Sequence, residues 1–175
     1  MPSQPFRTLF LCRENTCRSI MAEAILRDMD NRFEAFSAGS KPAVEIDTAT
    51  RLMLSSLGHD TGPLHPKGWT EFATIEAPAL DFVFTVCDQE AGEICPTWPG
   101  NPVTAHWSIP DPTLAKGNAA ERALALRETY KMLAQRISLF VSLPFERLDR
   151  IALTNRLAAI GRLRMVSDDQ DSTSI

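Results

Sequence analysis

One short segment of the chain combines residue types that suit the binding of a tetrahedral oxyanion. Cys12 and Arg18 are separated by five residues, after an apolar run and before a helical pattern. A loop between a strand and a helix directs its amide N–H groups at one point, where an anion binds. Such donors also stabilise a cysteine thiolate, and an arginine holds two anion oxygens in a bidentate fork. Cys12 is therefore the candidate nucleophile, and Arg18 is the candidate oxyanion ligand.

The other side chains of this segment have expected supporting roles. The Ser19 hydroxyl is placed to donate a hydrogen bond to the thiolate, and the Asn15 amide can fasten the loop to itself. Cys17 is expected to pack beneath the loop rather than to react. The alternative to an anion site is a buried cysteine that lies near an unrelated surface arginine. The candidate substrate-binding residues are Arg13, Glu14, Asn15, Thr16, Cys17, Arg18 and Ser19.

The apolar pattern of the chain alternates between strand and helix signals. Asp47 is a plausible N-cap for a helix with Ala49, Met53 and Leu57 on its apolar face, and Gly58 is the expected stop. The expected strands are 8–12, 33–37, 81–87 and 103–107. The expected helices are 19–29, the one after Asp47, a short one near 69–73, a short one after residue 87, 119–143, and about 146–160.

Strands that alternate with helices predict βαβ units and a parallel sheet. We expect an α/β fold of three layers, with helices on both faces of a four-stranded parallel sheet and an extra C-terminal helix. Ligands of such sheets bind at the carboxyl ends of the strands. Cys12 and Cys87 both lie at such ends, so they are expected to share one crevice. We expect a single domain over residues 1–166 and a disordered polar tail over 167–175.

The composition is that of an ordinary globular protein, with 44% apolar and 23% charged residues. The net charge of −4 argues against a broad nucleic-acid or membrane surface. No apolar stretch approaches the ~18 residues of a membrane span, and the N-terminus lacks the pattern of a signal peptide. We therefore expect a cytoplasmic protein whose four cysteines are reduced thiols rather than a structural disulfide framework. We also expect a monomer or a weak dimer.

Two stretches of the sequence resemble a known family. Residues 9–26, LFLCRENTCRSIMAEAIL, resemble the phosphate loop of low-molecular-weight tyrosine phosphatases and of the arsenate reductases that share their fold. Residues 81–112, DFVFTVCDQEAGEICPTWPGNPVTAHWSIPDP, are similar to the arsenate reductase pattern, in which a cysteine ends a strand, a second cysteine precedes proline, and His-Trp and Asp-Pro follow. With SAGS at 37–40, the resemblance covers about residues 8–161.

The resemblance implies that the chain reduces arsenate with three thiols and no bound cofactor. Cys12 would attack arsenic while Asp111 protonates the leaving oxygen. Cys87 would then attack Cys12 and release arsenite, and Cys95 would attack Cys87. An external reductant of the thioredoxin or glutathione/glutaredoxin type would reduce the final disulfide. Cys87 and Cys95 are eight residues apart, which is about 12 Å in a helix, so pairing would require the segment to unwind.

Three other interpretations remain open at this point. Cys12, Arg18 and Asp111 would suffice for a phosphomonoester or protein-tyrosine phosphatase, although Thr113 stands where that branch usually has tyrosine. The chain could also be a non-catalytic oxyanion or redox sensor with Cys12 as its switch. A zinc site of Cys87, Cys95 and His106 is the third interpretation, but it lacks a close Cys-x-x-Cys pair.

The sequence departs from the family pattern near the loop. In some relatives an asparagine, a glutamate, a serine and an aspartate hold a potassium ion, and the first three match Asn15, Glu23 and Ser37. Lys67 aligns with the aspartate, so its ammonium is expected to replace the cation. A carboxylate at Glu14 is expected to repel an anion unless it points outward. Phosphate or sulfate is expected to bind as an analogue of arsenate.

Overall fold

The computed structural model describes residues 4–87 and 96–163 and contains one four-stranded sheet. Every pair of neighbouring strands in it is parallel. The central strand is β1, where Leu9 and Phe10 point to opposite faces and are both fully buried. Burial on two faces explains why this strand reads as a continuous apolar run. The strand order is β2 (Phe33–Gly39), β1 (Phe6–Cys12), β3 (Phe82–Thr85) and β4 (Val103–His106).

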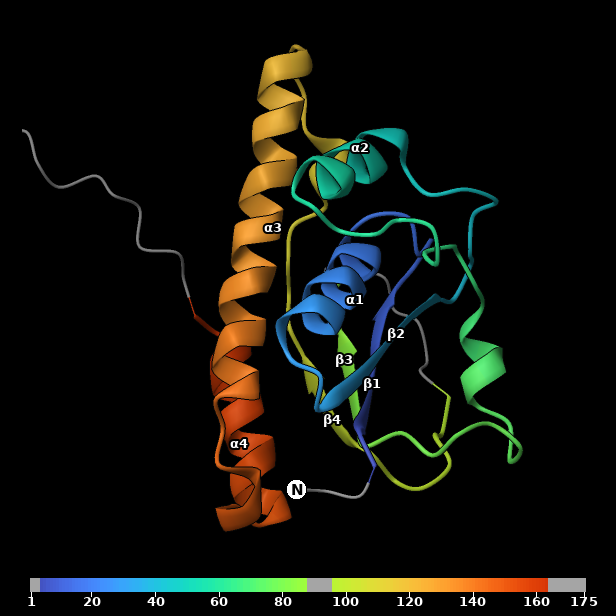
Figure 1. The fold of residues 1–175 in the computed structure, drawn as a ribbon, viewed down its shortest axis with the longest axis vertical. Helices are drawn as coiled ribbons and strands as arrows, with labels where there is room; N and C mark the ends of the chain where they lie inside the picture. The colour runs from blue at the N-terminus through green and yellow to red at the C-terminus, as the bar shows by residue number, and fades with distance from the viewer. Residues whose placement is uncertain (1–3, 88–95, 164–175) are drawn as a thin grey trace, which may run out of the picture.

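Three α-helices cover one face of the sheet (Figure 1). They are α1 (Arg18–Met29), the long α3 (Ala119–Val141) and α4 (Arg150–Gly161). The core beneath them is aromatic, and the Phe84 and Trp107 rings lie 4.1 Å apart between centroids. The indole N–H of Trp107 donates to the Leu157 carbonyl at 3.0 Å, which joins the end of β4 to α4. The extra C-terminal helix is therefore part of this core.

The opposite face is covered by a different kind of layer. Leu9, Leu11 and Val83 pack there against Phe72 and Trp98. Phe72 belongs to the 3₁₀ helix η1 (Trp69–Phe72), which occupies the predicted short helix near 69–73. The α/β class and the parallel sheet are thus confirmed. On this second face, the described residues form η1 and irregular segments rather than long helices, as the turn-forming residues of 59–80 favour.

The helix α2 (Thr48–Ser56) begins and ends where the sequence predicts, but it is rotated. The Asp47 carboxylate accepts a hydrogen bond from the Thr50 amide at 2.9 Å, and Gly58 has a φ of +88°. The predicted apolar face of Ala49, Met53 and Leu57 is wrong in part, because only Met53 packs partly against the core while the fully buried residues are Thr50 and Leu54. Thr50 is buried because its hydroxyl has a partner inside the protein, which the apolar pattern could not reveal.

Both C-terminal helices are shorter than predicted. α3 ends at Val141 rather than 143, because the residue before Pro144 is disfavoured in helical geometry. α4 begins at Arg150 rather than 146, because the Asp149 carboxylate caps it by accepting from the Ala152 amide at 2.8 Å. The intervening residues form the 3₁₀ helix η4 (Phe145–Arg147).

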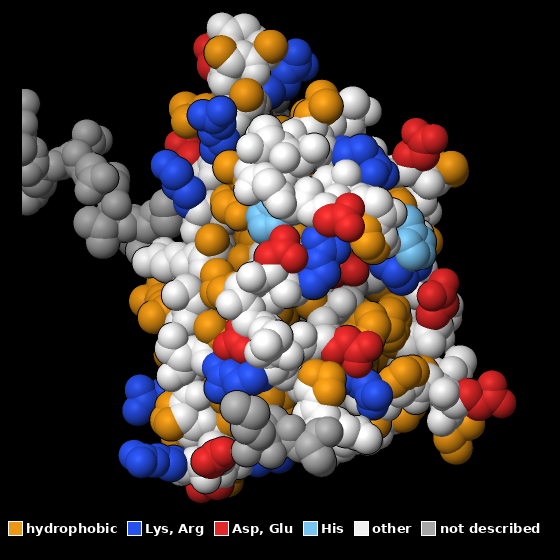
Figure 2. Space-filling view, viewed as in Figure 1, with side chains coloured by type: hydrophobic (Ala, Val, Ile, Leu, Met, Phe, Trp, Pro, Cys, Tyr) orange, Lys and Arg blue, Asp and Glu red, His pale blue; other side chains and the backbone are white. Residues whose placement is uncertain are grey.

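The surface carries charges of both signs. Figure 2 shows Lys and Arg side chains interspersed with Asp and Glu over the visible face, without a broad region of one sign. Within residues 4–87 and 96–163, none of the helices has the length and apolar character needed to cross a membrane. The predicted tail over 167–175 and the predicted short helix after residue 87 lie outside the described residues.

Candidate active site

The loop between β1 and α1 wraps its backbone around the Cys12 thiol. The Asn15 amide N–H donates to Cys12 Sγ at 3.2 Å, and Ser19 Oγ lies 2.8 Å from the same sulfur. Asn15 has a φ of +54°, a left-handed conformation that asparagine tolerates better than most residues. The strand-loop-helix arrangement predicted around Cys12 is confirmed, and two donors converge on its sulfur.

The Asn15 side chain ties the loop together and anchors it to a distant segment. Its Nδ2 donates to Ser19 Oγ at 2.8 Å, and its Oδ1 accepts from the Lys67 amide at 2.9 Å. Because an amide nitrogen can only donate, Ser19 accepts from Asn15 and keeps its own hydroxyl proton for Cys12. The geometry therefore fits the predicted donation from Ser19 to the thiolate.

A close backbone approach fixes the first half of the loop. A Cβ atom on Gly39 would lie 2.4 Å from the Arg13 carbonyl oxygen and 3.1 Å from the Asn15 amide nitrogen. The segment after β2 continues this contact, since the Lys41 amide donates to the same Arg13 oxygen at 2.9 Å. The Ala43 amide donates to the Glu14 carbonyl at 3.0 Å. The end of β2 and the residues after it therefore fix the backbone position of the loop.

Arg18 and Asp111 meet at the edge of this loop, although they are far apart in sequence. The Arg18 guanidinium is largely buried and donates to the Ile109 carbonyl at 2.8 Å. Its other terminal nitrogen lies 3.4 Å from Asp111 Oδ2. Asp111 follows β4 and caps the short 3₁₀ helix η3 (Pro112–Leu114). The carboxyl ends of β1 and β4 thus deliver a cation and a carboxylate to one place, as expected for a parallel sheet.

These groups line a cavity of about 180 Å³. The cavity brings together the predicted nucleophile, the predicted oxyanion ligand and the predicted general acid. Glu14 is exposed at its rim, so water can screen the carboxylate charge. The lining residues are Cys12, Arg13, Glu14, Thr16, Cys17, Arg18, Asp111, Thr113 and Leu114.

Cys17 differs from Cys12 in its surroundings. The Thr50 hydroxyl donates to the Asp47 carboxylate at 2.8 Å and lies 3.2 Å from Cys17 Sγ, which is buried beneath the loop. Burial raises the pKa of the Cys17 thiol to about 12, and the nearby Thr50 hydroxyl only partly opposes this effect. At neutral pH Cys17 is therefore a thiol rather than a thiolate, which fits the predicted packing role.

The predicted loop-support residues form one buried cluster with Asn15. The Lys67 ammonium donates to the Ser37 carbonyl at 3.1 Å and to the His65 carbonyl at 3.0 Å. It lies 3.9 Å from Glu23 Oε2, which also accepts a hydrogen bond from the Ser37 hydroxyl. Burial raises the pKa of Glu23, and the positive charge of Lys67 only partly opposes this shift. The cluster therefore surrounds an ammonium group with oxygen atoms.

Two further predicted residues, Cys87 and His106, lie near the ends of β3 and β4. Cys87 is partly exposed and follows β3, whose Thr85 pairs with Leu11 beside Cys12. The two cysteines thus lie at the same edge of the sheet, and the shared crevice stays a prediction. Cys95 lies outside the described residues. His106 Nδ1 lies 2.5 Å from Thr85 Oγ1, which links the ends of β3 and β4.

Within the part of the chain that the structure describes, no group of three or more His, Cys, Asp or Glu side chains could hold a metal ion. The zinc interpretation includes Cys95, which is not among those residues, so it stays untested.

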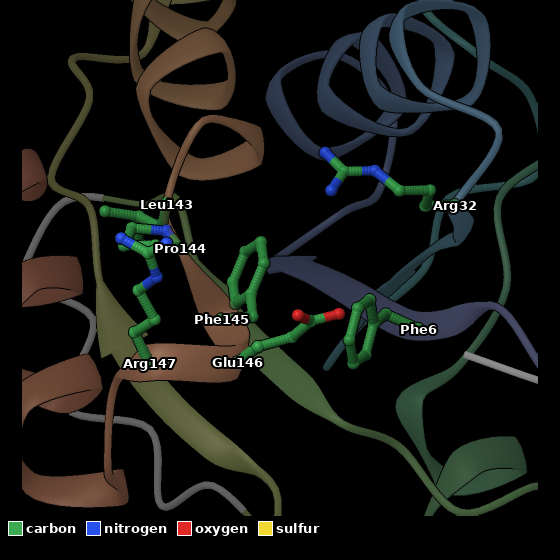
Figure 3. Close-up of a pocket in the computed structure, with 7 residues that line it drawn as sticks. All are labelled: Phe6, Arg32, Leu143, Pro144, Phe145, Glu146 and Arg147. Atoms are coloured by element: carbon green, nitrogen blue, oxygen red, sulfur yellow. The ribbon is translucent and has the colours of Figure 1, made fainter. Parts of the chain in front are cut away.

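A larger cavity, of about 510 Å³, opens at the amino edge of the sheet (Figure 3). Phe6 and Phe145 form its aromatic part. Its Arg32 guanidinium is already bound by the Asp30 carboxylate at 2.6 Å and the Val141 carbonyl at 2.8 Å. None of the predicted site residues lies there. Size does not identify the candidate site, because cavities larger than the one around Cys12 are present, whereas the chemistry of the lining selects the one around Cys12.

Sequence reasoning missed three contacts at the site. The Thr50 hydroxyl reaches Cys17, the Ile109 carbonyl accepts from Arg18, and Thr113 donates to Asp111. The last one had a local signal, because an aspartate followed by proline is a typical helix N-cap. The other two join residues 33 and 91 positions apart and have no local signal.

The chain is similar in sequence and in fold to proteins of one known family. The model of the low molecular weight phosphotyrosine protein phosphatase family matches residues 7–151. An arsenate reductase of Halalkalibacterium halodurans is 30% identical over 135 residues, which cover 75% of this chain and 91% of that protein. The arsenate reductase of Archaeoglobus fulgidus has a similar structure, with a TM-score of 0.59, 27% identity, and coverage of 75% of this chain and 98% of that one.

A thioredoxin-dependent arsenate reductase of Corynebacterium glutamicum is also similar, with a TM-score of 0.59 and 25% identity over 84% of this chain and 66% of that one. The matched region contains the loop around Cys12 as well as Cys87 and Asp111. The resemblance seen in the sequence is therefore confirmed: this protein belongs to the low molecular weight phosphotyrosine protein phosphatase family, and the relatives named here are arsenate reductases.

Proposed function

We propose that this protein reduces arsenate to arsenite, with Cys12 as the nucleophile and electrons from an external thiol reductant. The observation that carries the proposal is the Cys12 sulfur held by the Asn15 amide and beside the Ser19 hydroxyl, in a cavity shared with Arg18 and Asp111. The similar proteins described above are arsenate reductases, and one of them is thioredoxin-dependent, which supports arsenate as the substrate and a thioredoxin-like donor.

The first step uses the cavity around Cys12. Loop amides and the Arg18 guanidinium hold the arsenate oxygens. The Cys12 thiolate then forms an S–As bond as one As–O bond breaks. Asp111 gives its proton to the departing oxygen, which leaves as water. Arsenic stays at oxidation state five in this step.

The second step is the reduction. The Cys87 thiolate attacks Cys12 Sγ, so that an S–S bond forms and the S–As bond breaks. The electron pair of that bond goes to arsenic, which leaves as arsenite. Cys95 then attacks Cys87, which frees the Cys12 thiolate and leaves a Cys87–Cys95 disulfide. A dithiol reductant restores both thiols by exchange.

The position of Cys87 favours reduction over simple phosphoester hydrolysis. Hydrolysis needs Cys12, Arg18 and Asp111 but has no use for a second cysteine. Cys87 is partly exposed after β3, the strand hydrogen-bonded to β1 at the level of Leu11. A thiol on the neighbouring strand end is suitably placed to approach an adduct on Cys12.

The test is arsenite production from arsenate with thioredoxin, thioredoxin reductase and NADPH. We expect Cys12→Ser, Cys87→Ser and Cys95→Ser each to reduce turnover to the level without enzyme. Cys17→Ser is the matched control, because it removes a buried thiol of the same loop and is expected to keep turnover within about threefold of the wild type.

Other outcomes would change the proposal in defined ways. Turnover lost only in Cys12→Ser would mean that an external thiol, in this assay that of thioredoxin, resolves the arsenic adduct directly. Absence of arsenite with Cys12-dependent hydrolysis of a phosphomonoester would replace the proposal with a phosphatase. Unchanged protein and substrate in both assays would favour the sensor interpretation.

We also propose that the Lys67 ammonium takes the place of a bound cation beside the loop. The hydrogen bonds that this ammonium donates to the Ser37 and His65 carbonyls, and its distance of 3.9 Å from Glu23 Oε2, support this role. Turnover of the wild type is expected to be equal in sodium and potassium chloride at the same ionic strength. Lys67→Met, which keeps the stem and removes the charge, is expected to lower thermal stability because Glu23 loses its counter-charge. Faster turnover of the wild type in potassium than in sodium would contradict this role.

A further inference from the structure

The two carboxylate oxygens of Asp111 have different partners. Oδ1 accepts a hydrogen bond from the Thr113 amide at 2.9 Å and another from the Thr113 hydroxyl at 2.6 Å. Oδ2 lies on the side of Arg18, 3.4 Å from its terminal nitrogen. Thr113 itself lines the cavity around Cys12 and is exposed at the rim. One residue therefore occupies one oxygen and leaves the other for the cavity.

We propose that Thr113 is a positioning residue that determines which oxygen of Asp111 exchanges a proton with the substrate. The inference rests on the proposed function through the acid role of Asp111. That role is shared by arsenate reduction and by phosphoester hydrolysis in the same cavity, so the inference can be tested separately from the identity of the substrate.

The backbone of Asp111 cannot make this selection alone. A residue before proline is confined to extended geometry, and Asp111 has a φ of −76° and a ψ of 109° before Pro112. These angles place the side chain, but the terminal torsion of an aspartate is broad and roughly two-fold. Two donors on the same oxygen hold the plane of the carboxyl group and keep that oxygen an acceptor, so the acid proton resides on the other oxygen. The Thr113 hydroxyl supplies the shorter of the two hydrogen bonds.

The selected oxygen has a defined task in each reaction. When the Cys12 sulfur bonds to the central atom of the oxyanion, the bond to the leaving oxygen breaks and Asp111 Oδ2 gives up its proton to that oxygen. In hydrolysis of a phosphocysteine, the water oxygen bonds to phosphorus as the S–P bond breaks, and Asp111 Oδ2 takes the proton from water. Without these donors the proton could reside on the oxygen that faces away from the cavity, or the carboxyl group could turn out of the plane that aims an oxygen at these atoms.

The test compares leaving groups that differ in their need for a proton. p-Nitrophenolate is a stable anion and leaves with little protonation, whereas phenolate is more basic and requires it. We expect Thr113→Val to lower kcat/KM about tenfold for phenyl phosphate and less than about twofold for p-nitrophenyl phosphate. Thr113→Ser keeps the hydroxyl and is expected to restore both values. Equal losses on the two substrates would overturn the proposal.

A double-mutant cycle separates positioning from other effects. In an Asp111→Asn background, Thr113→Val is expected to have no further effect, and an undiminished loss there would contradict a role through Asp111. Thr104→Val is the control, since Thr104 is exposed on β4 and does not line the cavity. Hydrolysis of aryl phosphates by a wild type that does not reduce arsenate would refute the proposed function while leaving this comparison readable.

A second measurement needs no turnover. In a crystal structure of Thr113→Val, the Asp111 carboxylate is expected to be turned out of its wild-type plane or split between two planes. A single carboxylate in the wild-type plane would overturn the proposal even if neither reaction could be detected.

Discussion

Replacement of Arg18 by lysine is expected to lower kcat/KM for arsenate by about 10²–10³-fold, the range seen when one preorganised oxyanion donor is removed. Arg18 donates to the Ile109 carbonyl with one terminal nitrogen and lies beside Asp111 with the other. A lysine keeps the charge but offers a single nitrogen, so it cannot bind two oxygens in a fork and hold the Ile109 carbonyl as well.

Arg13 provides the matched control for this substitution. It belongs to the same loop and lines the same cavity, but its side chain is exposed. Arg13→Lys is expected to change kcat/KM by less than about threefold. Urea denaturation should show that Arg18→Lys loses only ~0.5–1.5 kcal/mol of stability, the contribution of one hydrogen bond. Near-wild-type activity of Arg18→Lys would mean that the cavity responds to charge alone, and similar kinetic losses in both variants would mean that the Arg18 fork has no special role.

The second large effect is expected from Gly39→Ala. The added methyl group would lie 2.4 Å from the Arg13 carbonyl oxygen and 3.0 Å from its carbon, both of which are backbone atoms. Neither can rotate away, so the loop must move from the end of β2. We expect a loss of about 1–3 kcal/mol in the free energy of unfolding and at least a tenfold loss of kcat/KM, because a displacement of about 1 Å is costly in a preorganised site.

Gly68→Ala is the control for this prediction. Gly68 forms an isolated parallel bridge with Gly39, so it lies in the same region. Its φ of −77° suits any residue, and its added methyl group would meet nothing closer than 3.5 Å. Stability and activity are therefore expected to stay near the wild type. A Gly39→Ala variant that behaves in the same way would show that the loop can relax without cost.

Features of the fold that follow from local sequence, or from the general geometry of parallel sheets, were predictable. Apolar runs located the four strands, and Asp47 and Gly58 marked the two ends of α2 because capping is a local effect. The positions of Cys12 and Cys87 at one edge of the sheet followed from the rule that parallel strands share their carboxyl ends.

Features that depend on tertiary contacts were not predictable. The buried face of α2 was only partly predicted because Thr50 is held by the Cys17 sulfur, a contact that outweighs the polarity of threonine. The division of the Asp111 oxygens between Thr113 and Arg18 depends on where η3 folds back toward α1. Amino-acid types alone do not specify either arrangement.

The packing of α4 against the sheet shows that the hydrophobic core extends beyond the part of the chain that matches the family. The family match ends at residue 151, one residue after α4 begins. Yet Leu153, Leu157 and Ile160 belong to the same core as Phe84, and a Cβ atom on Gly161 would lie only 2.7 Å from the His106 carbonyl oxygen. Excising the chain at the family boundary would expose the buried Trp107 and leave β4 uncovered beside the acid loop. The C-terminal extension is thus part of the hydrophobic core that supports the active site.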